Sequence, residues 1–435
     1  MAAATHCLHG ILKRFGLDHF HVEYNVYFSN HLLHAVVALH KLGASEERLE
    51  QYAREISQQF EPTHPSEGQL SGDEWRSLLG KRERFPDLCQ FFRQEVAQRG
   101  VSGAIGHYMP SLLNGGIACA AFHPIIHLGY ALLGESDQDV GDGLAYVVFE
   151  HRSPASDAAD HAIHQRTGCA MSTVEGKAST AVPQQAAVQF TRLDHALFNL
   201  LQKLRKDERL QKLLPILYER VDARGLDVLA AETGFGLFSN RLFIIQDNAT
   251  ELINGHMEES GLLASITTEE RLDSLFRAVM QVAVGTYAST EVPDDFFLLH
   301  GVTSAYALHQ VLPHLPSLAD RVNAVAVFCR DLLTAFVLRD MPVLVGWTPD
   351  ESDLPSWDEI KERATADEDE HLIKLVFTCS AMEQLLGKSW NGYQLYRAVA
   401  AYKSGLRQWP RGNMAHASVC SRAGSAAWSG ARLEK

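Results

Sequence analysis

Two histidines one helical turn apart stand inside the apolar stretch AFHPIIHLGYALLG, residues 121 to 134. Residues four apart share one face of a helix, so the imidazoles of His123 and His127 can bind a single metal ion. Pro124 lies between them, which places the pair in the first turn of a helix. An imidazole is costly to bury without a partner. The pair is therefore interpreted either as hydrogen-bonded core histidines or as metal ligands.

A second segment, NVYFSNHLLHAVVALHKLGAS (25–45), places His31 and His34 three residues apart on one helical face. Asn30 can cap this helix or orient His31 through a hydrogen bond. His40 falls at a different angle, and we expect it at the surface. This pair, too, fits both core histidines and ligands.

A third segment, DDFFLLHGVTSAYALH (294–309), carries His300 inside an apolar helix beside Gly301, with Thr303 near. A lone histidine on an apolar face also fits a hydrogen-bonded core residue. His309 and His314 lie nearer the end of this helix, and we expect them to be exposed.

The fourth segment, EDEHLIKLVFTCSAM (368–382), places His371 and Lys374 on one face that continues to Thr378. A lysine in an apolar run either extends its ammonium to water or is buried with a lowered pKa. A neutral lysine amine can capture carbon dioxide and form a carbamate, which offers an oxygen ligand. The acidic residues 367–370 fit a solvated helix N-terminus.

A single metal ion at the centre of a helical bundle would explain why all four apolar segments carry imidazoles. Imidazole-rich sites suit iron, zinc, copper or nickel rather than magnesium. An oxygen ligand from Lys374 favours non-haem iron.

Helical periodicity dominates the elements that must position these residues, and the sequence predicts a mainly α fold, a multi-helix bundle around a central metal-binding core. Capping boxes are expected at Thr267–Glu270 and Thr365–Glu368. Strand-like runs at 144–151 and 241–247 fit helices as well. The clearest helical patterns cover 45–60, 85–100, 267–288, 294–312, 317–340 and 365–387.

The chain of 435 residues is long enough for a large core. We expect one domain over 1–435, which could form two lobes at about 1–150 and 189–405. The segment 152–188 is interpreted as a loose connection and 417–435 as a disordered tail, since both are rich in small and polar residues.

Composition excludes several classes of function. The net charge of −14 disfavours nucleic acid and acidic membranes as partners. No apolar run approaches the roughly 20 residues that span a bilayer, and the N-terminus fits no secretory signal, so a cytoplasmic protein is expected. Seven scattered cysteines without CxxC spacing argue against disulfides and a thiolate zinc site.

The four segments together resemble the questin oxidase-like family, enzymes that oxidatively open anthraquinone-type rings. The resemblance rests on the NHxxH and LGAS of 30–45, the HPxxHLGYxL of 123–132, LLHGVTSAYAL at 298–308, and the HxxK of 371–374. It covers roughly residues 15–405. The chain departs from the family pattern at Ala35, where the family has another histidine, which would fit a different substrate or a loss of activity.

The resemblance implies an α-helical oxidoreductase that uses dioxygen and non-haem Fe(II) held by several histidines and a carboxylated lysine. The lysine corresponds to Lys374, with His371 beside it in the catalytic site. The histidines that match are His31, His34, His123, His127, His300 and His371. Of these we favour His123, His127, His300 and His371 as ligands, with His31 or His34 contributing or orienting.

The resulting hypothesis is oxidative cleavage of a carbon–carbon bond in a planar phenolic quinone or related polyketide. Aromatic residues near the motifs could stack on this substrate: Tyr27, Phe122, Tyr130, Phe297 and Tyr306.

Three alternatives stay open at this point. A Baeyer–Villiger-type oxygenase would need NADPH, although TGFGLF (233–238) lacks a complete GxGxxG motif. A hydrolase would use zinc in the same site. A helical interaction protein would hold structural histidines only.

Overall fold

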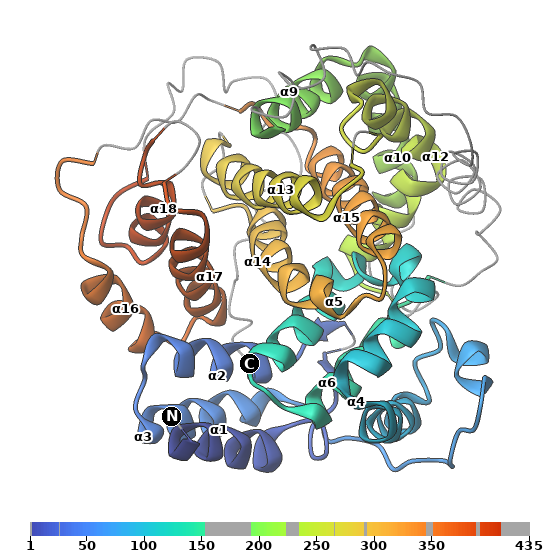
Figure 1. Ribbon diagram of the computed structural model, residues 1–435, viewed down its shortest axis with the longest axis vertical. Helices are drawn as coiled ribbons and strands as arrows, with labels where there is room; N and C mark the ends of the chain where they lie inside the picture. Colours follow the sequence, from blue (N-terminus) through green and yellow to red (C-terminus); the bar gives the residue numbers. More distant parts are fainter. Residues whose placement is uncertain are drawn as a thin grey trace.

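Helices form nearly all of the regular structure in the part of the chain described by the computed structural model (Figure 1). The predicted mainly α fold is confirmed, with 15 helices in this part. The predicted connecting segment, apart from Arg152, and the predicted tail lie outside the described residues, which are 2–25, 27–152, 193–222, 235–264, 266–290, 294–344, 351–388 and 392–409.

The first part of the chain forms six helices and one short hairpin. The antiparallel strands β1 (Glu23–Tyr24) and β2 (Phe28–Ser29) pair Glu23 with Ser29. Two 3-10 turns follow at η1 (Ser57–Gln59) and η2 (Glu74–Leu78). The helices are α1 (Ala2–Phe15), α2 (Leu32–Leu42), α3 (Glu46–Ile56), α4 (Phe85–Gly116), α5 (Cys119–Leu133) and α6 (Asp137–Phe149).

The second part of the chain adds nine helices and the 3-10 turn η5 (Leu312–His314) within the described residues. They are α9 (Leu193–Lys206), α10 (Glu208–Asp222), α12 (Leu237–Ser260), α13 (Glu269–Ser289), α14 (Phe296–Val311), α15 (Leu318–Leu338), α16 (Trp357–Thr365), α17 (Glu370–Leu386) and α18 (Leu395–Lys403).

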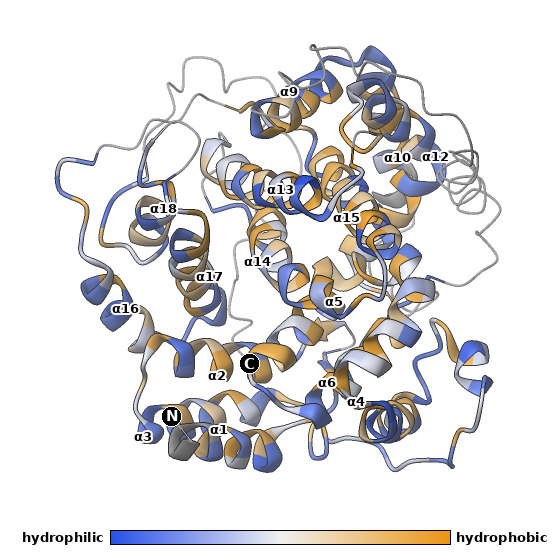
Figure 2. Ribbon diagram, in the orientation of Figure 1, coloured by the Kyte–Doolittle hydropathy of each residue, from blue (hydrophilic) through white to orange (hydrophobic). Residues whose placement is uncertain are grey.

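Four helices from distant parts of the sequence enclose the centre of the molecule. α2 packs on α5, α5 on α14, α14 on α17, and α17 on α2, so that the contacts close a circle. Figure 2 shows mostly hydrophobic colours on α14 in the middle of the view and mostly hydrophilic colours on α16 at the edge. The buried polar residues that these four helices carry toward one another include His34, His127, His300 and Lys374.

The close approach of α5 to its neighbours depends on two glycines. A Cβ added at Gly129 would lie 2.6 Å from the Cα of Ala307 on α14. A Cβ at Gly143 would lie 2.8 Å from the Cα of Leu128, where α6 crosses α5. A side chain at either position would push α5 outward and move the histidines that it carries.

The helices predicted at 45–60, 85–100, 267–288, 294–312 and 317–340 correspond to α3, the first half of α4, α13, α14 and α15, but two helix starts differ from the prediction. Thr268, not Thr267, caps α13, since its side chain accepts a hydrogen bond from the backbone N–H of Arg271. Asp369, not Thr365, caps α17, because Thr365 already ends the separate helix α16. The strand-like runs at 144–151 and 241–247 lie mainly in α6 and entirely in α12, respectively. Among the described residues, no helix combines the length and apolarity needed to cross a bilayer.

Candidate metal centre

The four helices of the central circle each place one histidine near their N-terminal end. His31 is the N-cap residue of α2, and His371 is the second residue of α17. His300 lies in the second turn of α14, and His123 follows the irregular start of α5. All four side chains are largely or fully buried. We call His31, His123, His300 and His371 the four-histidine cluster.

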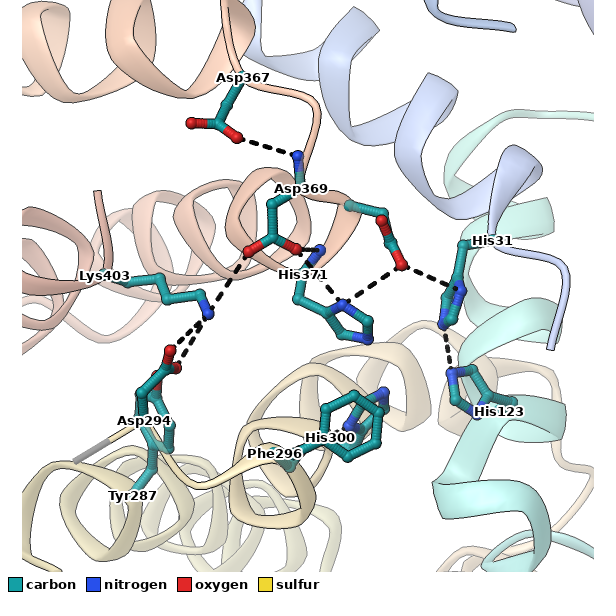
Figure 3. A network of polar contacts seen from close by, with 11 residues as sticks. His31, His123, Tyr287, Asp294, Phe296, His300, Asp367, Asp369, His371 and Lys403 are labelled. Carbon is teal, nitrogen blue, oxygen red and sulfur yellow. Dashed lines mark hydrogen bonds and ion pairs between the residues drawn. The ribbon is translucent and has the colours of Figure 1, made fainter. Parts of the chain in front are cut away.

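The members of the four-histidine cluster surround one point (Figure 3). The imidazole centroids of His31 and His123 are 4.5 Å apart, and those of His123 and His300 are 4.7 Å apart. The circle continues from His300 to His371 at 5.1 Å and returns to His31 at 4.9 Å. His31, His300 and His371 each offer one ligand atom within 4.8 Å of the others, so they could hold a metal ion.

Oxygen atoms around the cluster fix which nitrogen of each imidazole is available. The Nδ1–H of His123 donates to the carbonyl of Ala120, and that of His300 donates to the carbonyl of Phe296 at 2.7 Å. The Nδ1 atoms of His31 and His371 lie 3.6 Å and 3.4 Å from one carboxylate oxygen of Glu370. Oxygen partners of this kind select the tautomer that leaves a lone pair on Nε2.

The Nε2 atoms then lack ordinary partners. Those of His300 and His371 are buried without any hydrogen bond. Those of His31 and His123 lie only 2.6 Å apart, a separation that needs a proton or a cation between two lone pairs. Burial, followed by neighbouring positive groups, keeps the pKa of His31, His123 and His300 well below the ordinary value. Buried imidazole nitrogens that converge on one point, two of them with no hydrogen bond, fit a metal ion.

A strained turn positions His123. Ala120, Ala121 and Phe122 have φ angles of 45°, 53° and 66°, a left-handed conformation that costs about 1–2 kcal/mol per residue. The turn is held by Ser239 of α12, whose Oγ accepts a hydrogen bond of 2.9 Å from the N–H of Ala120. The carbonyl of the same residue accepts the Nδ1–H of His123.

Lys374 on α17 is fully buried, with no hydrogen-bond partner for Nζ. Of the two sequence readings, the one in which its ammonium reaches water is therefore wrong. Burial lowers the pKa of Lys374 to about 8, with Glu370 and Asp369 opposing the shift. The charge of Lys374 also contributes, after burial, to the lowered pKa of His31, His34, His123 and His300.

His34 and His127 form a second pair beside the cluster. Their centroids are 5.2 Å apart, and the ring of His34 lies 5.6 Å from that of His31 and 6.1 Å from that of His123. Neither nitrogen of either residue has a hydrogen-bond partner. Burial lowers the pKa of His127 to about 3. All six histidines singled out in the sequence are thus near one another. His31 belongs to the four-histidine cluster, whereas His127, which the sequence favoured as a ligand, contacts His34 beside that cluster.

Sequence reasoning missed three residues at this site. Glu370 and Asp369 were interpreted as part of a solvated helix end, but both contact the Nδ1 of His371. Phe296 places its ring 4.4 Å from that of His300 and 4.9 Å from that of His371, and it is 42% exposed. The only signal in the sequence was position: Asp369 and Glu370 directly precede His371, and Phe296 lies one turn before His300.

A charged network extends from His371 toward α18 (Figure 3). Asp369 accepts a hydrogen bond from the backbone N–H of His371 and lies 3.6 Å from the Nζ of Lys403. Lys403 donates to both carboxylate oxygens of Asp294, which also accepts from the hydroxyl of Tyr287. The network ties the start of α17 to α18 and to Asp294, two residues before α14.

The other sequence candidates lie in varied places. Tyr130 is buried 5.6 Å from the ring of His34, and Phe122 is buried in the strained turn. Tyr27 is partly exposed, Phe297 packs on Phe238, and Tyr306 packs on Phe377.

Two histidines that the sequence placed at the surface, His309 and His314, are half-buried. His309 stacks on Phe276, and His314 contacts the hydroxyl of Ser102. His40 is partly exposed at the end of α2, and the side chain of Asn30, the residue before the N-cap, accepts a hydrogen bond from the N–H of Leu32.

The fold and the site define an all-helical protein with a buried, histidine-rich site that could hold one metal ion. The family model described as questin oxidase-like matches residues 28–379. The chain therefore belongs to the questin oxidase-like family, a family of oxidoreductases, as the sequence motifs predicted.

Three curated proteins show how far this similarity extends. Questin oxidase from Aspergillus terreus is 24% identical over 368 residues, which cover 80% of this chain and 73% of that enzyme. Baeyer–Villiger oxidase AgnL3 from Paecilomyces divaricatus is 25% identical over 126 residues, 26% of this chain and 27% of its own length. Baeyer–Villiger monooxygenase dmxR6 from a Cryptosporiopsis species is 28% identical over 141 residues, 29% of this chain and 32% of its own.

Proposed function

We propose that this protein uses dioxygen and a non-haem iron to break a carbon–carbon bond in the ring of an anthraquinone-like polyketide. The observation that carries the proposal is the convergence of four buried imidazoles on one point, two of them with an Nε2 that has no hydrogen bond. Lys374 is buried without a partner, and its charge adds to burial in lowering the pKa of His31, His123 and His300. The similarity to a questin oxidase over most of the chain supports the substrate class.

The residues that would hold the iron are the four-histidine cluster, each through Nε2, and Lys374. When bound, ferrous iron activates dioxygen and polarises a substrate oxygen. The low pKa of three of the histidines keeps their Nε2 lone pairs free at neutral pH. Glu370 orients His31 and His371 from the other side of their rings.

Lys374 would serve as a carbamate. Its lowered pKa leaves part of the population as the neutral amine near neutral pH, which can attack the carbon of carbon dioxide. A nitrogen–carbon bond forms, one proton leaves, and the product carries a negative charge on oxygen. Such an anionic ligand would balance a cation in a site otherwise built from imidazoles.

Phe296 offers the surface on which the substrate would stack, because its ring is partly exposed and contacts both His300 and His371. A planar quinone on this ring would lie at the edge of the cluster.

The names of two relatives favour a second candidate, insertion of oxygen beside a ketone by Baeyer–Villiger chemistry. A monooxygenase of this type reduces the second oxygen atom to water and needs two electrons, for which NADPH is the usual donor. Oxygen uptake with an anthraquinone, measured with and without NADPH, separates the two candidates. Uptake that requires NADPH would favour the Baeyer–Villiger monooxygenase over the dioxygenase.

The decisive experiment is elemental analysis of protein purified without oxygen, alongside Lys374→Met and Ile373→Met. Ile373 is the adjacent, fully buried residue of α17, so the control variant tests the effect of a new methionine alone. We expect near-stoichiometric iron in the parent protein and in the control, and loss of iron in Lys374→Met.

Two results would contradict the proposal. Equal iron in all three proteins would remove Lys374 from the ligand set. Stoichiometric zinc together with ester or phosphate hydrolysis would replace the oxidoreductase by the hydrolase alternative.

A further inference from the structure

A small apolar cavity lies between α9, α13, α14 and α15, next to the helix that carries His300. Its volume is about 50 Å³, and aliphatic and aromatic side chains form most of its wall. Among the lining residues, only Thr286 bears a hydroxyl, and this group has no hydrogen-bond partner. An ordered water needs two to four polar partners, and the side chains of the lining offer one hydroxyl, so the cavity favours an apolar occupant over an ordered water.

The volume limits what this occupant can be. An apolar cavity of roughly 150 Å³ takes up benzene or xenon. The cavity here has about one third of that volume, too little for an aromatic ring of the substrate. It fits a molecule or atom of the size of dioxygen or xenon.

The position of the cavity links it to the four-histidine cluster. Gly301 follows His300 directly, and Phe297 lies one turn before it; both line the cavity. The ring of Phe297 lies 5.2 Å from that of Phe296, which contacts His300 and His371. The cavity and the cluster therefore flank the same turn of α14.

We propose that this cavity is a binding site for a small apolar gas, and that dioxygen occupies it before reaching the four-histidine cluster. The inference rests on the proposed function, since it assigns a place to the co-substrate of that reaction. Dioxygen is apolar, and transfer of an apolar solute from water into an apolar environment is favourable. Occupancy of the cavity would raise the local concentration of dioxygen beside His300 and so lower the KM for oxygen.

The test begins with xenon, which reports on the cavity without any turnover. Crystals of the full chain under xenon pressure should show a bound atom among Phe297, Gly301 and Ala283. Ala283→Leu should fill the cavity and abolish this peak. Gln281→Leu, half-buried on the same helix α13 and outside the lining, should retain it. Absence of xenon from the parent protein would overturn the proposal.

Oxygen kinetics with an anthraquinone then test the role of the cavity. We expect Ala283→Leu to raise the KM for oxygen severalfold with kcat almost unchanged, and Gln281→Leu to match the parent protein. Cys329→Met provides a second filling variant if Ala283→Leu does not fold. An unchanged KM for oxygen in a folded, xenon-free variant would refute the role of the cavity.

The two failures are distinguishable. A protein that binds xenon but consumes no oxygen would overturn both the proposed function and the dioxygen assignment. A protein that consumes oxygen but binds no xenon would overturn the cavity site alone.

Discussion

The left-handed turn from Ala120 to Phe122 permits a direct measurement of the strain stored beside His123. A left-handed alanine costs about 1–2 kcal/mol because its Cβ approaches the following carbonyl oxygen, whereas glycine adopts this conformation at no such cost. Ala121→Gly should therefore relieve the strain at one residue of the turn.

The magnitude follows from a matched pair of variants on α5. Ala121 and Ala131 are both buried, but Ala131 has ordinary helical geometry. Glycine at either position removes one methyl, worth about 0.8 kcal/mol of burial, and gives the unfolded chain the same additional freedom. These two contributions cancel between the variants. Ala131→Gly should therefore lower the free energy of unfolding by about 1–2 kcal/mol more than Ala121→Gly, the difference being the strain.

Equilibrium denaturation of both variants against the parent protein, with metal removed by a chelator, provides the assay. A free energy of unfolding that is almost unchanged in Ala121→Gly but clearly lower in Ala131→Gly would support the strained turn. An equal loss in both variants would refute it, and His123 would then need another explanation for its orientation.

Three further predictions concern the packing, the pH dependence and the orientation of ligands. Gly129→Ala should lower the free energy of unfolding by about 1–3 kcal/mol through overpacking and should weaken metal binding. Gly255→Ala on α12 has open space around it and should cause neither loss. Chemical denaturation measures the first effect and metal titration the second. Burial raises the pKa of Asp139 to about 7 from 3.8, so the folded state retains a proton that the unfolded state has lost. The free energy of unfolding should then fall between about pH 4 and pH 7, by up to about 1.4 kcal/mol per pH unit, and Asp139→Asn should remove this slope. A slope that persists in the variant would contradict the assignment. Glu370→Gln should weaken metal binding roughly 10–100-fold, which is the usual effect of losing a residue that orients a metal ligand. Glu368→Gln, at the exposed position two residues earlier, should leave the affinity unchanged. Equal metal affinities in the two variants would exclude Glu370 from orienting His31 and His371.

The local sequence was sufficient to find the four helices that carry the clustered histidines. Histidines among leucines and valines are conspicuous because imidazoles seldom belong on a face that packs into a core. The i, i+3 and i, i+4 spacings then follow from helix geometry.

Contacts between distant segments could not be found in this way. Phe296 and Phe297 are adjacent and chemically identical, yet only the first contacts the cluster while the second lines the cavity. The carboxylate of Glu370 contacts His31, which is far away in the sequence. Such choices depend on how α2, α14 and α17 pack together.

The sequence by itself determined that this chain is helical and that four of its helices carry imidazoles at core positions, because periodicity and spacing are local properties. Tertiary structure alone decided which nitrogens face one another and that Lys374 is buried without a partner. It also decided that three residues before His123 adopt a left-handed turn. The reason is physical: a side chain's partners and its removal from water depend on packing between helices, and helical periodicity does not encode that packing.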